Sequence, residues 1–81
     1  MNPIGAAFEQ RRRRRNTIDA AVDEYVRWRE ACLTVRRAYD SWAIARPGER
    51  LLAHAAYVAA LDREGEAAAS YERRIEDAAA R

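Results

Sequence analysis

The sequence predicts an all-α protein, an antiparallel two-helix hairpin of the coiled-coil type that assembles into a four-helix bundle. One interruption, Arg46-Pro47-Gly48, divides a chain of 81 residues that otherwise favours helix from Asn16 onward. Apolar residues recur at alternating spacings of three and four on both sides of it. Because a chain this short buries little surface as a hairpin alone, we expect self-association to complete its core.

The predicted order along the chain is an arm, a helix, a turn and a second helix. Residues 1–15 form a flexible cationic arm, and residues 16–81 form the hairpin, with helices at about 17–45 and 48–80 and a turn at about 46–48. Asn16 is a suitable N-cap for the first helix. Pro47 disfavours helical backbone at Arg46 and suits the first turn of a new helix. Gly65 costs about 1 kcal/mol relative to Ala, and we expect the second helix to continue through it.

Heptad spacing predicts the seam along which the two helices pack. The seam residues are Ile18, Tyr25, Trp28, Cys32, Val35, Tyr39 and Trp42 on the first helix, and Leu51, His54, Val58, Leu61, Gly65, Ala68 and Ile75 on the second. If Trp42 faces Leu51 across the turn, Trp28 packs against Gly65 and Tyr39 lies beside His54. Large residues then oppose small ones, as close packing requires.

Apolar residues outside this seam predict a dimer interface, formed by Val22, Val26, Leu33, Ile44, Leu52, Ala55 and Ala59. The apolar arc of the first helix spans about 200°, wider than the roughly 100° that one neighbouring helix covers. The sequence therefore predicts a homodimer or a helical protein partner.

The residue types exclude most enzyme classes, and we expect no catalytic site, no cofactor, no metal and no small-molecule substrate. Cys32 and His54 are the only cysteine and histidine, and they lie too far apart in the predicted register to share a metal ion. Arg29 and Arg36 share one heptad position, and such a pair resembles the dicarboxylate site of the all-helical chorismate mutases in architecture alone. Lysine and a third helix are absent, so ion pairs are the simpler role for these two arginines.

The charge is concentrated at the N-terminal end. Residues 1–15 carry Arg11, Arg12, Arg13, Arg14 and Arg15 against one acid, whereas residues 16–81 carry twelve acids and ten arginines. Like-charge blocks are often interaction tails. The alternative function is therefore a nucleic-acid-associated protein whose arm binds phosphates, with an anionic membrane surface and a solvated tail also open.

The preferred function is a small non-enzymatic module for protein–protein interaction or oligomerisation. A single cysteine, and the lack of an apolar run of about 20 residues, favour a cytoplasmic protein without a membrane span. In length and architecture the hairpin resembles the small WXG-type helical proteins, but Trp42-Ala43-Ile44 does not supply their Trp-x-Gly turn. The sequence thus predicts a fold and a mode of action, and no family.

Overall fold

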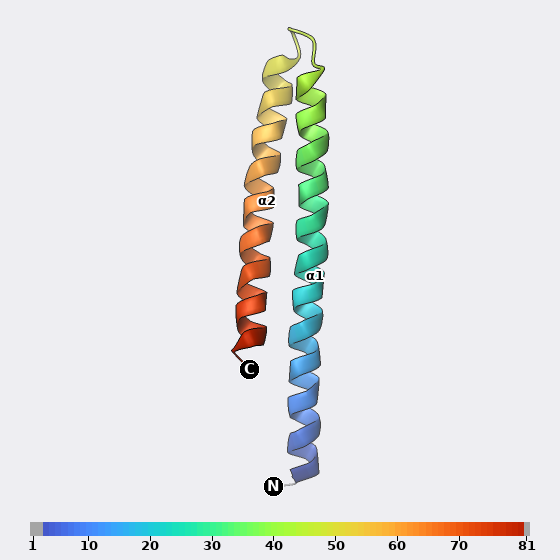
Figure 1. Ribbon diagram of the computed structural model, residues 1–81, viewed down its shortest axis with the longest axis vertical. Coiled ribbons are helices and arrows are strands. Elements are labelled where there is room, and N and C mark those ends of the chain that lie inside the picture. Colours follow the sequence, from blue (N-terminus) through green and yellow to red (C-terminus); the bar gives the residue numbers. More distant parts are fainter. Residues whose placement is uncertain (1–2, 81) are drawn as a thin grey trace.

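A computed structural model describes residues 3–80 as two long helices joined by a short turn (Figure 1). Helix α1 spans Pro3–Ala43 and helix α2 spans Arg50–Ala79. They run antiparallel, side by side, in a rod of 70 × 14 × 14 Å. The predicted all-α helical hairpin is therefore confirmed.

The turn between the helices is formed at the proline. Helix α1 ends at Ala43 and α2 begins at Arg50, each two residues from the predicted bounds. Pro47 lacks an amide hydrogen and restricts Arg46 to extended backbone, so the α1 ladder cannot continue. The amide of Glu49 donates to the Arg46 carbonyl at 2.8 Å, which closes the turn before α2. Helix α2 then continues through Gly65 without a break, as expected.

The start of α1 differs from the prediction. The helix begins at Pro3, well before the predicted start near residue 17, so residues 3–15 of the predicted arm are helical. Asn16 lies inside the helix and does not cap it. The intervening alanines, glutamine and arginines are all strong helix formers. Thr17 donates its hydroxyl to the Arg13 carbonyl at 2.7 Å, so even this weaker helix former satisfies its polar group locally. Residues 1–2 lie outside the described residues.

Because α1 is longer than α2, its N-terminal part extends beyond the end of its partner helix (Figure 1). Ile18 and Ala78 line the same groove, which places the end of α2 beside this part of α1. Residues 3–16 of α1, the overhang, project from that point by about 21 Å at 1.5 Å per residue. The predicted cationic arm is therefore presented on a helix.

The observed seam on α1 agrees with the heptad count in part, and the seam on α2 is shifted by one residue. On α1, Trp28, Cys32, Val35 and Trp42 are half-buried and Ala21 is buried, whereas the predicted seam residues Ile18, Tyr25 and Tyr39 are exposed. On α2 the residues turned toward α1 are Ala53, Tyr57, Ala60, Glu64, Ala67, Tyr71 and Ala78. The first five lie one position before a predicted seam residue, and Tyr71 and Ala78 continue the same stripe at helical spacing. One residue rotates a helical stripe by about 100°. The predicted α2 seam was wrong.

The physical reason for this shift is the width of the α1 side chains. Two tryptophans on α1 need small neighbours and flat partners. The stripe with Ala53, Ala60 and Ala67 lets the helices approach, while Tyr57 and Tyr71 stack on the indoles. The aliphatic stripe of Leu51, Val58, Leu61 and Ile75 instead lies on the flank of α2, where all four are exposed.

The register along the hairpin also differs from the prediction. Tyr39 lies beside Tyr57 and Tyr25 beside Tyr71, each three residues further along α2 than the predicted partners His54 and Ala68. Gly65 is exposed, and a Cβ placed on it would meet nothing within 4 Å. The expected packing of Trp28 against Gly65 is therefore wrong.

The core of the hairpin consists of small side chains only. Among the described residues the buried apolar ones are Ala21, Ala60 and Ala67, and no larger side chain is fully enclosed. The accessible surface is 6733 Å². A compact monomer of 9.3 kDa exposes about 5,000 Å². The isolated hairpin thus exposes far more surface than a globular protein of its size.

Candidate interaction surface

Two aromatic clusters hold the helices together, and they repeat at an interval of fourteen residues. In the first, Trp28 stacks on Tyr71 with ring centroids 5.8 Å apart, and Tyr25 meets Tyr71 edge-on at 5.5 Å. In the second, Trp42 stacks on Tyr57 at 5.5 Å and Tyr39 meets Tyr57 at 5.7 Å. Fourteen residues are two heptads, so the same face of each helix carries both clusters.

Between the clusters a carboxylate enters the seam. The indole N–H of Trp28 donates to Oε1 of Glu64 at 2.7 Å, and Sγ of Cys32 lies 3.9 Å from the same oxygen. Glu64 is half-buried. A charged acceptor makes this a strong hydrogen bond, and it fixes the rotation of α2 against α1.

One broad face of the hairpin, the front face, carries most of the large exposed apolar side chains, and the exposed Arg29, Arg36 and Glu72 lie among them. Its apolar residues are Ile18, Val22, Tyr25 and Tyr39 from α1 with Val58, Leu61 and Ile75 from α2. All seven side chains are between 40% and 54% exposed. At its open end a groove of about 410 Å³ is lined by Ile18, Ala21, Val22, Tyr25, Tyr71, Ile75 and Ala78. Large apolar side chains gathered on one exposed face are typical of protein interaction sites.

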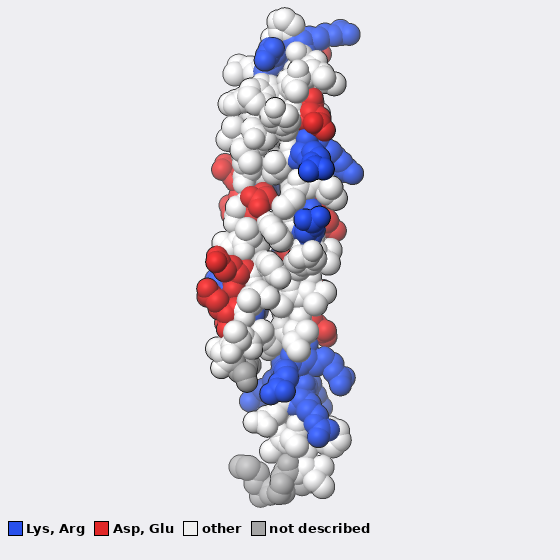
Figure 2. All heavy atoms as spheres, viewed as in Figure 1, with Lys and Arg blue, Asp and Glu red and all other residues white. Residues whose placement is uncertain are grey.

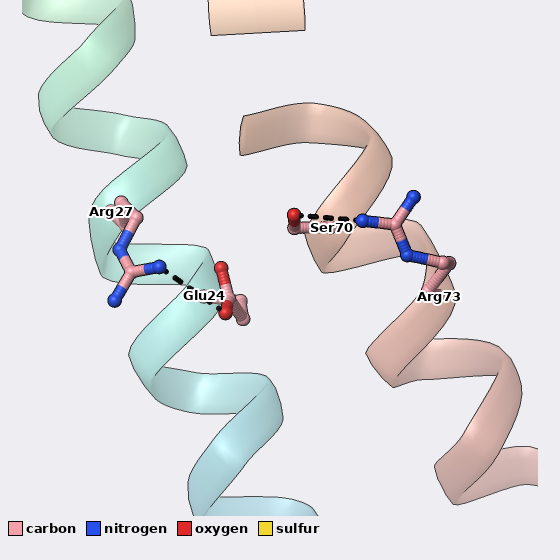
Figure 3. Close-up of polar contacts among 4 residues, drawn as sticks. All are labelled: Glu24, Arg27, Ser70 and Arg73. Carbon is pink, nitrogen blue, oxygen red and sulfur yellow. Dashed lines mark hydrogen bonds and ion pairs between the residues drawn. The ribbon is translucent and has the colours of Figure 1, made fainter. Parts of the chain in front are cut away.

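The opposite face is polar. Its two shallow clefts are lined by Glu24, Ser70, Arg73, Arg74, Glu76 and Asp77, and by Arg27, Glu30, Ala31, Thr34, Arg63, Glu66, Ala67 and Ser70. Arg27 donates to Glu24 at 3.4 Å and Arg73 to Ser70 at 3.0 Å, so both contacts stay within their own helix (Figure 3). The second carboxylate oxygen of Glu24 is buried without a hydrogen-bond partner. This face exposes charged side chains to solvent and carries little apolar area.

The residues predicted for the dimer interface fall on different sides of the rod. Val22 lines the front groove, and Val26, Leu33 and Ile44 continue around the outer side of α1. Leu52, Ala55 and Ala59 are exposed but lie about 120° around α2 from Val58 and Leu61. The front face therefore combines one residue of the predicted interface, Val22, with residues of both helices that were predicted for the seam.

The residues weighed for chemistry are dispersed. His54 is exposed, and its ring lies 4.8 Å from that of Trp42 instead of beside Tyr39. Cys32 is half-buried with a free thiol. Arg29 and Arg36 are exposed. Within residues 3–80, no group of three or more His, Cys, Asp or Glu side chains is arranged to hold a metal ion.

The five consecutive arginines lie on the overhang. Figure 2 shows basic surface gathered at the end of the rod where α1 continues alone. Arg12 pairs with Glu9 at 3.5 Å, and the guanidinium of Arg11 lies 5.9 Å from the centre of the Phe8 ring. Among the described residues the only other ion pair joins Arg27 to Glu24, so no ion pair ties the overhang to α2.

Sequence reasoning missed four residues of these surfaces, namely Tyr57, Tyr71, Glu64 and Phe8. The tyrosines are fourteen residues apart, as are the two Tyr-x-x-Trp motifs of α1, and this shared interval was the available signal. No local signal indicates that Glu64 faces an indole. Phe8, which is 60% exposed, was missed because it lies in the segment predicted to be a flexible arm.

Comparisons with protein-family models, with curated proteins and with solved structures find no match to this chain. Neither α1 nor α2, within the part of the chain that the structure describes, is long and apolar enough to cross a membrane. The case for function therefore depends on the surfaces themselves.

Proposed function

We propose that this protein is a small non-enzymatic interaction module that dimerises through its front face into a four-helix bundle. The observation that supports the proposal is the mismatch between core and surface. Among the described residues nothing larger than alanine is buried, while seven large apolar side chains line one face. Burying apolar surface stabilises a protein by about 25 cal/mol per Å². Covering the front face would therefore add the stabilisation that the small core does not provide.

The shape of the front face suits a second copy. The two-helix part of the rod is about 45 Å long, at 1.5 Å for each of the 30 residues of α2, and 14 Å wide. This gives an area of the order of the 800 Å² that each partner buries in a stable complex. A two-fold axis would bring the same apolar surface together from both chains, and two hairpins packed in this way form a four-helix bundle. A different helical protein with a matching apolar face is the alternative occupant. A cytoplasmic location is part of the same proposal.

Sedimentation equilibrium of the full chain tests the proposal. We expect a dimer at micromolar concentration. Val22→Glu places a charge in the front groove and should raise the dimer dissociation constant by at least about tenfold. Thr34→Glu is the matched control, since it replaces a β-branched residue of the same helix on the opposite face, and it should leave the constant unchanged. A folded monomer that persists at high micromolar concentration would refute the homodimer and favour the hetero-partner.

The second candidate function is association with nucleic acid through Arg11 to Arg15. The observation that favours it is their position on a helix that projects beyond α2. That observation supports a more specific inference.

A further inference from the structure

We propose that the overhang, residues 3–16 of α1, is a binding element for double-stranded DNA that enters the major groove as a preformed helix. The inference goes beyond the interaction module and does not depend on the dimer. It starts from the distribution of charge: the overhang carries five arginines against Glu9 as its one acid, and α2 does not reach it to neutralise them.

The arrangement of the arginines around the helix favours a groove over a flat surface. Successive residues of an α-helix are rotated by 100°, so Arg11 to Arg15 point in all directions around the axis. A helix with side chains in a groove about 12 Å wide has phosphates on both sides, and arginines on every side of it can reach both walls. A flat anionic surface would contact the helix on one side only, and several of the arginines would then make no contact with it.

The same arrangement disfavours an anionic membrane. A helix that lies on a bilayer keeps its charges on one face and its apolar residues on the other. On the overhang, Phe8 lies on the side that leads toward Ile18, and Arg11 and Arg15 interrupt that stripe. The overhang therefore lacks the continuous apolar face that insertion between lipid headgroups requires.

The dimensions also fit a B-form duplex. An α-helix with its side chains is about 10–12 Å in diameter, which matches the width of the DNA major groove, whereas the major groove of RNA duplexes is too narrow. The overhang is about 21 Å long, enough to cross the groove. A basic helix that continues out of a helical bundle is an established way to present side chains to DNA. Since all five charges reach phosphates, binding should depend little on base sequence.

Fluorescence anisotropy with the full chain and a short labelled DNA duplex tests the inference. The affinity should fall steeply with salt, with a slope of about −4.5 in log affinity against log salt for five phosphate contacts. Changing Arg11 to Arg15 to Gln, a good helix former, should weaken binding about a hundredfold. The matched control changes five exposed arginines outside the overhang and the front face to Gln, which lowers the net charge equally, namely Arg37, Arg46, Arg50, Arg63 and Arg74. Equal losses in the two variants would overturn the proposal, because net charge alone would then explain binding.

A second pair of variants tests whether the helix itself matters. Arg13→Pro and Arg13→Ala remove the same charge, but only proline breaks the helix. We expect the proline variant to bind DNA several-fold more weakly than the alanine variant, and equal affinities would overturn insertion as a helix. Binding of the unmodified chain should also be tighter to DNA than to an RNA duplex of the same sequence or to vesicles of phosphatidylcholine and phosphatidylserine. A preference for either of these probes would refute DNA as the partner.

Discussion

The indole N–H of Trp28 donates a 2.7 Å hydrogen bond to Oε1 of Glu64, across the boundary between α1 and α2. This contact joins residues that are 36 positions apart in the chain. It is the only hydrogen bond among residues 3–80 that links nitrogen or oxygen side-chain atoms of the two helices. Because the rest of the seam is apolar and aromatic, this directional hydrogen bond largely fixes the rotation of α2 about its own axis relative to α1.

The Trp28 to Glu64 contact should contribute measurably to stability. A double-mutant cycle of Trp28→Phe and Glu64→Met, followed by urea unfolding with circular dichroism, should give a coupling free energy of about 1 kcal/mol. Two heptads away, the equivalent pair is Trp42 and Arg50, which share no hydrogen bond. The cycle of Trp42→Phe and Arg50→Met should therefore give a coupling near zero. Indistinguishable couplings in the two cycles would argue against the contact.

Stacking on the two tyrosines of α2 should be a main source of cohesion between the helices. Changing Tyr57 or Tyr71 to Leu should lower the free energy of unfolding by about 1–3 kcal/mol, through lost ring contacts and lost burial. Near-ultraviolet circular dichroism should weaken in parallel. Neither hydroxyl makes a hydrogen bond within the described residues, so Tyr57→Phe and Tyr71→Phe should change stability by less than about 0.5 kcal/mol.

Gly65→Ala should stabilise the hairpin by about 0.5–1 kcal/mol. Gly65 is exposed in the interior of α2 and its added Cβ meets nothing within 4 Å, so the substitution removes chain entropy from the unfolded state without a clash. Thermal unfolding of the unmodified chain and of the Gly65→Ala variant checks the sign of the change in stability. A lower melting temperature for Gly65→Ala would instead support packing of a large side chain against Gly65.

On the same helix, we expect a larger side chain at Ala60 to lower stability. Ala60 is 2% exposed, and the larger side chain of Ala60→Leu would force the helices apart where Ala60 is enclosed. We expect this substitution to lower the free energy of unfolding by about 1–3 kcal/mol, the usual cost of overpacking. A neutral result in the same thermal experiment would place Ala60 outside the seam.

Removing residues 1–16 should leave the stability of the hairpin unchanged within about 0.5 kcal/mol, because residues 5–16 make no hydrogen bond or ion pair with α2 among the described residues. The ellipticity at 222 nm should fall, since the overhang is about a third of the 41 residues of α1. A large drop in the melting temperature would show that the overhang supports the body of the hairpin.

Local features of the sequence determined the existence of the two helices and the position of the break. Pro47 acts on its immediate neighbours, and helix propensity is a property of each residue, so both are visible without a partner helix. The seam of α1 was predictable in part, because Trp28, Val35 and Trp42 follow a single heptad stripe, whereas Tyr25 and Tyr39 on the same count are exposed beside it. The start of α1 was not, since Asn16 is a good cap only where the chain before it is not helical.

Tertiary packing alone decided the face that α2 turns toward α1. The helix carries two stripes one residue apart, an aliphatic one through Leu61 and a mixed one through Tyr57, Ala60 and Glu64. Hydrophobicity favours the first, and by itself the sequence of α2 gives no reason to bury the second. The tryptophans of α1 settle the choice, because they need alanines for close approach, tyrosines for stacking and a carboxylate for the indole N–H. The aliphatic stripe is left on the surface, where it forms half of the front face.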